Sequence, residues 1–115
     1  MIIQKENVQI DYQNVRGGNG DLEFRRIIRT PEDLMGKGRL FSHMVLQPNQ
    51  SVGYHQHVGD AEWYYIIAGH GEYNDNGKIV PVGTGDVCIC PEGESHGMVN
   101  TGEEPLEMIA LVLYK

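Results

Sequence analysis

The chain has 115 residues, a length that suits one domain with one hydrophobic core. Its formal net charge of −7 argues against a nucleic-acid partner, because phosphate binding needs a clustered excess of Lys and Arg. The longest apolar runs, WYYIIA and MIALVLY, are far shorter than the roughly 20 residues of a membrane helix, and the N-terminus lacks the pattern of a signal peptide. We therefore expect a cytoplasmic protein with no membrane partner.

Short runs rich in Val, Ile, Leu, Tyr and Trp follow one another along the chain, and turn signals separate them. In chain order these runs are NVQIDY (7–12), LEFRRIIR (22–29), LFSHMVLQ (40–47), SVGYHQH (51–57), EWYYIIA (62–68), KIVPV (78–82), DVCIC (86–90), SHGMVN (95–100) and LEMIALVLY (106–114). Most of the 15 glycines stand in the turns, where they supply positive φ. This spacing predicts an all-β sandwich or barrel.

Two stretches carry more specific local signals. TPEDLMG favours a short helical turn near residues 31–35, in which Thr30 could cap the start, Pro31 fits the first turn and Gly36 fits the end. DNG at 75–77 lies between two apolar runs and predicts a hairpin, because Asn-Gly favours the type I′ turn that matches strand twist.

The final run is apolar on both faces after Glu107. A strand of this kind needs cover on both sides, from a second sheet, from the N-terminal strands or from a partner chain. We therefore expect a homodimer, to whose interface the N-terminal strands within about residues 1–30 could contribute by exchange between subunits.

Cys88 and Cys90 are two residues apart on a predicted strand, so they point the same way at roughly 6 to 7 Å, near or beyond disulfide reach. One interpretation is two small buried side chains in a reducing compartment. The alternative is a thiol that lines a pocket.

His55 and His57 share one face of a predicted strand, because alternate residues point the same way. Glu62 is at an odd offset, but the turn residues VGD (58–60) can reverse the chain and bring it back beside the two imidazoles. His96 begins a later strand and could add a third imidazole. Three neutral nitrogens and one carboxylate suit a divalent first-row metal and, in octahedral geometry, leave two positions open.

Two extended motifs surround these residues. Gly53, His55, His57, Glu62 and Gly69 form G-x-H-x-H-x4-E-x6-G, and a second motif, G-x5-P-x-G-x2-H-x3-N, consists of Gly85, Pro91, Gly93, His96 and Asn100. Together they closely resemble the two signature motifs of the cupin superfamily, small jelly-roll barrels built as a double-stranded β-helix. One departure is Asn49, which stands where the first motif usually opens with glycine, and Asn tolerates the left-handed backbone angles of such a turn.

The resemblance implies a ligand set and several structural roles. His55, His57, Glu62 and His96 correspond to the metal ligands of the family, which implies one divalent first-row transition metal per chain: Mn, Fe, Ni, Co or Zn. The motif glycines are expected in turns, Pro91 at the end of a strand, and Asn100 in a contact that fixes the following turn. Tyr64, in phase with Glu62, is a candidate to line the cavity, as are Met98 and His43, although the favoured interpretation of His43 is an ordinary core or surface histidine.

The resemblance is to small single-domain cupins of the oxalate-decarboxylase-like group, so we expect residues 1–115 to form one cupin barrel. It implies a metal-dependent enzyme that acts on a small anionic or enolisable molecule, by decarboxylation or dioxygenation. The alternative is a non-catalytic module that binds or senses a small molecule through its metal. No general acid or base is evident, since Glu92 and Glu94 suit a solvated loop, and an epimerase-like role is disfavoured because it would not need the intact ligand set.

Overall fold

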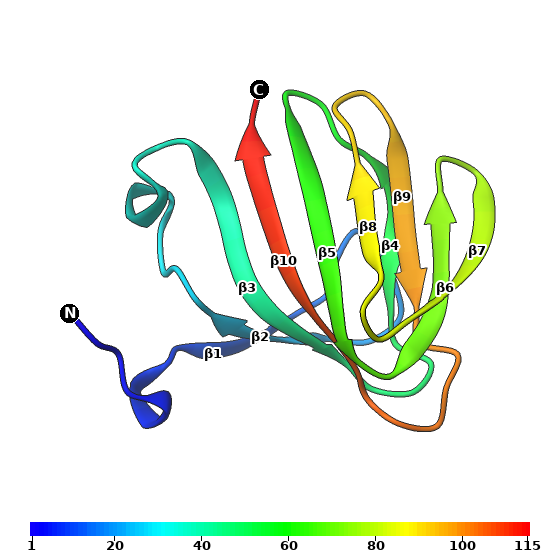
Figure 1. Cartoon of the computed structure of the whole chain (residues 1–115), viewed down its shortest axis with the longest axis horizontal. Coiled ribbons are helices and arrows are strands. Elements are labelled where there is room, and N and C mark those ends of the chain that lie inside the picture. Colours follow the sequence, from blue (N-terminus) through cyan, green and yellow to red (C-terminus); the bar gives the residue numbers. More distant parts are fainter.

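The computed structural model describes residues 1–115 and contains two antiparallel sheets that face each other (Figure 1). The larger sheet has six strands in the order β1 (Ile10–Gln13), β2 (Leu22–Arg26), β3 (Gly38–Leu46), β10 (Leu106–Tyr114), β5 (Asp60–Ala68) and β8 (Val87–Cys90). The smaller sheet has four strands in the order β4 (Ser51–Gln56), β9 (Ser95–Val99), β6 (His70–Asp75) and β7 (Lys78–Gly83). The predicted all-β jelly roll is confirmed.

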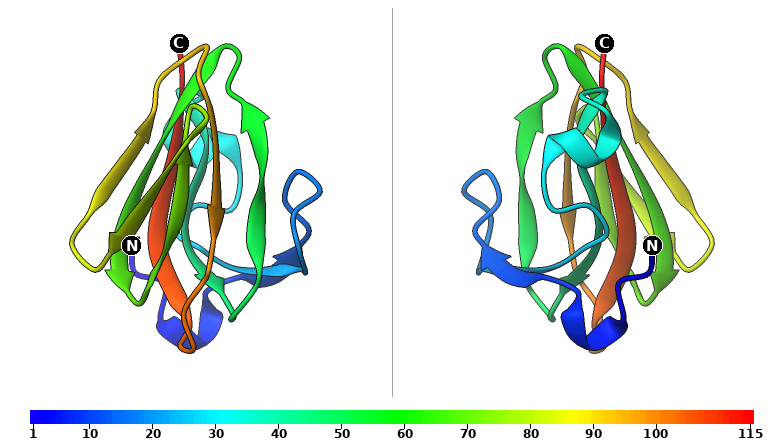
Figure 2. Two further views of the ribbon diagram at one scale, coloured as in Figure 1. Left: turned by 90° about the vertical axis from the view of Figure 1, so that its right-hand side faces the viewer. Right: turned by 90° about the vertical axis from the view of Figure 1, so that its left-hand side faces the viewer.

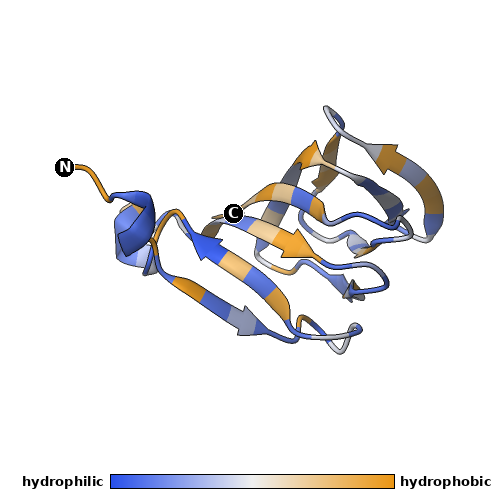
Figure 3. Ribbon diagram, turned by 90° about the horizontal axis from the view of Figure 1, so that it is seen from below, coloured by the Kyte–Doolittle hydropathy of each residue, from blue (hydrophilic) through white to orange (hydrophobic).

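The hydrophobic core fills the space between the two sheets. It forms because alternate residues of each strand point inward, as the alternating burial along β10 illustrates. The core cluster consists of Leu22, Phe24, Met44, Leu46, Val52, Tyr64, Ile66, Tyr73, Cys88, Met98, Leu106, Met108 and Ala110. Figure 3 shows hydrophobic and hydrophilic residues alternating along β1 and β2. The apolar residues Leu22 and Phe24 of β2 face the core, whereas those of β1 are exposed.

The predicted turns are present. Pro31–Leu34 form a single 3-10 turn, although the Thr30 side chain makes no capping hydrogen bond. Asn76 and Gly77 both have positive φ, 51° and 102°, as the type I′ hairpin between β6 and β7 requires.

The N-terminal segment differs from the prediction. Lys5–Asn7 form a 3-10 turn, so that β1 begins only at Ile10, and β2 ends at Arg26 rather than continuing to residue 29. The ladder stops there because the amides of Ile27 and Ile28 both donate to the same acceptor, the carbonyl oxygen of Phe41.

No helix of the structure is long and apolar enough to span a membrane.

The last strand, β10, is covered on one face only. Its inward residues are buried in the core, whereas Ile109, Leu111 and Leu113 on the outer face are only partly buried. The expectation of cover on both sides is therefore not met within this chain.

Candidate metal centre

A β-bulge in β4 turns its histidines toward the space between the sheets. In the pairing of β4 with β9, Val52 lies opposite Met98, and the next matched pair is His55 with His96, so the register shifts between these pairs. Before the bulge the even-numbered residues, such as Val52, point inward. After the bulge the odd-numbered residues do. The bulge therefore directs His55 and His57 to the interior.

Glu62 approaches the histidines from the opposite sheet. The chain reverses after β4 through Gly59, which has a φ of 80°, and then begins β5. As predicted, the reversal brings the carboxylate back to the imidazoles. His96 lies on β9, beside β4. The four side chains therefore join the two sheets.

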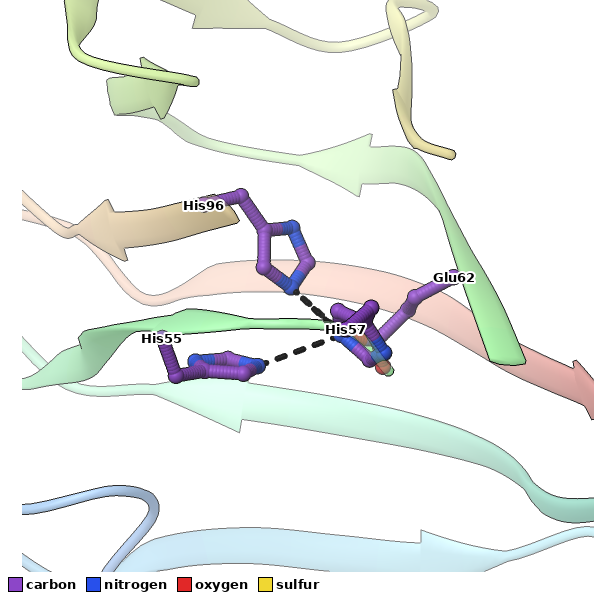
Figure 4. A group of neighbouring side chains, drawn as sticks. All are labelled: His55, His57, Glu62 and His96. Carbon is purple, nitrogen blue, oxygen red and sulfur yellow. Dashed lines mark hydrogen bonds and ion pairs between the residues drawn. The ribbon is translucent and has the colours of Figure 1, made fainter. Parts of the chain in front are cut away.

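The nitrogen and oxygen atoms of these side chains converge on one point (Figure 4). The Nε2 atom of His57 lies 3.2 Å from that of His55 and 3.0 Å from that of His96. The Oε1 atom of Glu62 lies 3.2 Å from Nε2 of His57 and 3.0 Å from Nε2 of His96. One potential ligand atom from each of the four residues lies within 4.8 Å of the others, so the group could hold a metal ion.

The opposite ring nitrogen of each histidine has a hydrogen-bond partner of its own. Nδ1 of His55 lies 2.7 Å from the carbonyl oxygen of Gly53, and Nδ1 of His57 lies 2.6 Å from Oδ1 of Asp60. Both partners can only accept, so each neutral ring carries its proton on Nδ1 and presents an Nε2 lone pair to the centre. Nδ1 of His96 lies 2.9 Å from the Tyr73 hydroxyl, which can accept in the same way.

This arrangement fits a cation on chemical grounds. Nitrogen lone pairs of neutral imidazoles cannot hydrogen-bond to one another, yet the Nε2 atoms of His57 and His96 lie 3.0 Å apart. A positive charge among them, either a proton or a metal ion, removes the repulsion. Three imidazole nitrogens and a carboxylate are ligands that first-row divalent metals accept.

The charge states that the pKa shifts of Glu62 and the histidines favour also suit a metal ion. Burial opposes the charge of Glu62, but hydrogen bonds from His57 and His96 lower its pKa to about 2, so it is a carboxylate at neutral pH. The hydrogen bond to Glu62 raises the pKa of His57 above its ordinary value, whereas burial lowers the pKa of His55. The pKa shifts of His57 and Glu62 both follow from the attraction between a positive charge on the imidazole and the buried carboxylate, so the centre favours a positive charge beside Glu62.

A second layer of side chains holds the first in place, and the sequence did not reveal the part of Asp60 and Arg39 in it. Asp60 accepts from His57 through one oxygen and from Nε of Arg39 through the other, at 2.9 Å. The ring of Tyr64 stacks on that of His96, with centroids 5.2 Å apart and an interplanar angle of 17°. Burial raises the pKa of Tyr64 well above its usual range, so its hydroxyl stays protonated.

A cavity of about 270 Å³ adjoins this centre. Its lining combines two of the candidate ligands with polar, basic and apolar residues: Gln13, Asn14, Val15, Arg16, Phe24, Arg26, Arg39, Leu40, Met44, His55, Glu62 and Tyr64. Tyr64 lies on the same face of β5 as Glu62 and lines this cavity.

The other two cavity candidates lie elsewhere. His43 is on the outer face of β3, where its Nε2 atom lies 2.8 Å from Oε1 of Glu107, because the inward positions of this strand are the even ones. Met98 points inward but is only 1% exposed and packs in the hydrophobic core. Neither residue lines this cavity.

The two cysteines are buried and unbonded. Burial raises the pKa of each thiol to about 11, so both stay protonated at neutral pH. Neither lines the cavity beside the histidines, but Cys88 borders a separate pocket of about 140 Å³ together with Tyr73 and Val82. Cys90 therefore fits the interpretation of a small buried side chain, whereas Cys88 is buried and also meets the alternative of a thiol that lines a pocket.

The structural motif residues take their expected roles. Gly69, Gly85 and Gly93 all have positive φ, and Asn49 has a φ of 71°, so the Asn adopts the left-handed turn normally made by glycine. The Asn100 amide donates to the carbonyl oxygens of Leu46 and Glu104 at 2.9 and 2.8 Å. It thereby fixes the turn before β10.

The fold agrees with comparisons to known proteins. Residues 42–113, more than half of the chain, match the family described as "Cupin domain". The chain belongs to the cupin family.

Among similar cupins, a curated protein of Thermotoga maritima named "Oxalate-binding protein" is 46% identical over 100 residues, which cover 87% of this chain and 82% of the relative. A crystal structure from Thermotoga maritima, described as a "predicted oxalate decarboxylase", superposes with a TM-score of 0.93 at 40% identity, over 100% of both chains. The polyketide cyclase RemF of Streptomyces resistomycificus shares the fold, with a TM-score of 0.76 at 22% identity, over 99% of this chain and 78% of its own.

Proposed function

We propose that residues 1–115 act as a single unit that binds one divalent first-row transition metal through His55, His57, Glu62 and His96. The metal would present a binding position to a small carboxylate anion. The observation that carries the proposal is the convergence of the four side chains, with each imidazole held at Nδ1 so that Nε2 faces the centre. When bound, the metal supplies a positive charge that attracts and polarises an anionic oxygen.

The cavity beside the centre supports an anionic ligand. Three arginines, Arg16, Arg26 and Arg39, line it together with His55 and Glu62. Guanidinium groups suit carboxylates because they offer several donors in a fixed plane. The name of the Thermotoga maritima relative makes oxalate the first ligand to test.

Binding without turnover is the function that the cavity favours. Decarboxylation of oxalate to formate and carbon dioxide needs a proton delivered to carbon. Glu62, which belongs to the candidate metal ligands, is the only carboxylate that lines the cavity, and the raised pKa of Tyr64 makes its hydroxyl a poor acid. We therefore propose a binding or sensing role first.

A metal-dependent enzyme, either a decarboxylase or a dioxygenase, is the second candidate. It is supported by the cavity itself, which gives a small molecule direct access to His55 and Glu62. Incubation of the metal-loaded protein with labelled oxalate, with and without dioxygen, distinguishes the two. A binding module returns the oxalate unchanged, whereas an enzyme releases labelled carbon dioxide.

Calorimetric titration with oxalate tests the binding proposal directly. The metal-loaded protein should bind about one oxalate per chain, and the metal-free protein should bind it much more weakly. Equal binding to the two forms would contradict a role for the metal.

We also propose that two chains associate through the outer face of the larger sheet. This face carries a continuous apolar surface, because Tyr65 pairs with Val87 on one side and with Ile109 on the other, and Trp63 pairs with Ile89. Tyr65, Val87 and Ile89 are each about half exposed in the single chain. Contiguous apolar surface of this kind marks a protein interface.

The mass in solution, measured by light scattering after gel filtration, tests this association. The unmodified protein should have twice the mass of one chain, and Tyr65→Glu combined with Ile89→Lys should reduce it to one. Ile79→Lys is the matched control, because Ile79 is equally exposed but lies on β7 of the smaller sheet. A single-chain mass for the unmodified protein would contradict the proposal.

The cellular location is a separate proposal. The thiols of Cys88 and Cys90 are buried and unbonded, which suits the reducing cytoplasm, where we expect the protein to act.

A further inference from the structure

The loop between β1 and β2 brings one arginine to the cavity beside the candidate metal centre. In Figure 2 this loop, in blue, stands beside β4. Arg16 lies within it and lines the cavity together with His55 and Glu62. The loop therefore forms one wall of the cavity, next to β4.

Arg16 differs from the other two arginines of the cavity in having no carboxylate partner. Arg26 donates to both oxygens of Asp11, at 2.9 and 2.8 Å, and Arg39 donates to Asp60. The guanidinium of Arg16 makes no hydrogen bond or ion pair within the chain, so its charge remains available to a ligand.

Close backbone packing fixes the loop against β4. The amide of Gly53 donates to the carbonyl oxygen of Val15 at 3.0 Å, and the amide of Ser51 donates to that of Asn19 at 3.0 Å. A methyl group on Gly53 would collide with the carbonyl oxygen of Arg16, and one on Gly18 would collide with that of Ser51. The two glycines therefore permit a contact that no larger residue would allow.

The same contact connects the loop to the metal centre. Gly53, whose amide holds the loop, also accepts the hydrogen bond from Nδ1 of His55 through its carbonyl oxygen. One residue in the bulge of β4 thus positions both the loop that carries Arg16 and the imidazole of His55. This short segment sets the position of the Arg16 backbone relative to the candidate ligand His55.

We propose that Arg16 is a specificity-determining residue that binds a carboxylate group of the anion held at the metal centre, and that the Gly18 and Gly53 contact positions it. This inference rests on the proposed function. A divalent metal and Arg16 bring three positive charges to the cavity and Glu62 removes one, while Arg26 and Arg39 are neutralised by their aspartates. The balance of two positive charges matches a dicarboxylate dianion.

Substitution of Arg16 tests the proposal in the metal-loaded protein. We expect Arg16→Gln to raise the Kd for oxalate by about 10- to 100-fold, the range of a hydrogen bond to a charged group. Arg16→Lys should give an intermediate loss, because it keeps the charge but not the planar fork. Arg25→Gln is the matched control: it removes the same charge from the neighbouring strand, on the outer face, and should leave the Kd unchanged.

Two further measurements separate this proposal from the one on which it rests. The metal affinity of Arg16→Gln, measured without oxalate, should equal that of the unmodified protein, because Arg16 acts on the anion. Gly18→Ala, which displaces the loop, should raise the Kd for oxalate as Arg16→Gln does, provided that circular dichroism shows an intact fold.

The outcomes are distinct. An unchanged Kd for oxalate in Arg16→Gln overturns the role of Arg16 while leaving metal-dependent binding intact. An equal loss in Arg16→Gln and Arg25→Gln also overturns it, since the effect would then be one of overall charge. Unmodified protein that takes up metal but binds no oxalate overturns both proposals.

Discussion

The Nδ1 atom of His57 lies 2.6 Å from Oδ1 of Asp60, and Oδ2 of the same carboxylate lies 2.9 Å from Nε of Arg39. Asp60 thus orients a candidate ligand from behind while Arg39 holds the aspartate. Partial burial alone would raise the pKa of Asp60, but the hydrogen bonds that it accepts from Nδ1–H of His57 and from Arg39 lower it below its ordinary value. The carboxylate therefore keeps its charge and makes the imidazole a stronger donor to a metal.

Asp60→Asn should weaken metal binding by about 10- to 100-fold, because the ligating imidazole loses its negatively charged partner. A competition titration with a chromogenic chelator measures the change. Asp86→Asn is the control, since Asp86 accepts a backbone hydrogen bond from Gly83 in an exposed turn away from the histidines. Equal affinities for Asp60→Asn and Asp86→Asn would contradict the role of Asp60.

Metal affinity should fall as the pH falls. The hydrogen bond to Glu62 raises the pKa of His57, so protons compete with the metal for its Nε2 atom at a pH above the ordinary histidine value of about 6.5. Metal binding should also release protons in that range, which calorimetry in buffers of different ionisation enthalpy detects. An affinity that stays constant from neutral to acidic pH would contradict coordination by this imidazole.

Glu62 should make the stability of the metal-free protein depend on pH. Its pKa is about 2 in the folded protein against 4.5 ordinarily, so its contribution is present above about 4.5 and is lost as the pH falls toward 2. The contribution is on the order of 3 kcal/mol. Urea unfolding of the unmodified protein and Glu62→Gln at about pH 5.5 and about pH 3 measures it. The difference between the two proteins should shrink with the pH, and a constant difference would argue against ion pairing of Glu62.

Asn100→Ala should destabilise the fold without a direct effect on the metal. The buried amide makes hydrogen bonds to Leu46, Glu104 and Gly102 that tie the end of β9 to the turn before β10. Their loss, which leaves buried groups unpaired, should lower the free energy of unfolding by about 2 to 4 kcal/mol. Asn19→Ala at the surface is the comparison and should cost much less. Similar losses for the two variants would contradict a special role for Asn100.

Much of the site could be predicted from the sequence because its spacing reflects strand geometry. His55 and His57 share a face because residues two apart on a strand point the same way. The turn at 58–60 then returns Glu62 to them. The inward direction of the two histidines, however, depends on the bulge after Val52. Gly53 inside a strand pattern was a signal for this bulge, but strand periodicity alone does not use it. The resemblance to the cupin motifs indicated that the four candidate ligands form one set, which strand periodicity alone could not.

The assignments that the sequence left open or missed have physical causes. β3 carries apolar residues on both faces, so alternation did not reveal that His43 points outward while the polar Ser42 is buried inside. In the sequence, Asp60 has the pattern of a turn residue, although an acidic residue three positions after a candidate ligand is a usable signal for a carboxylate that orients the imidazole. Arg16 lies in a glycine-rich turn, and only the fold shows that this turn packs against β4.

The most direct test of the central claim is the metal content of the unmodified protein and His96→Ala, measured by elemental analysis before and after titration with first-row metals. The unmodified protein should hold close to one ion per chain, and His96→Ala should lose most of its affinity while keeping its β-sheet circular dichroism. His70→Ala, on the exposed start of β6, should behave as the unmodified protein does. Unmodified protein that contains no metal and takes up none would contradict the claim, as would unchanged affinity in His96→Ala.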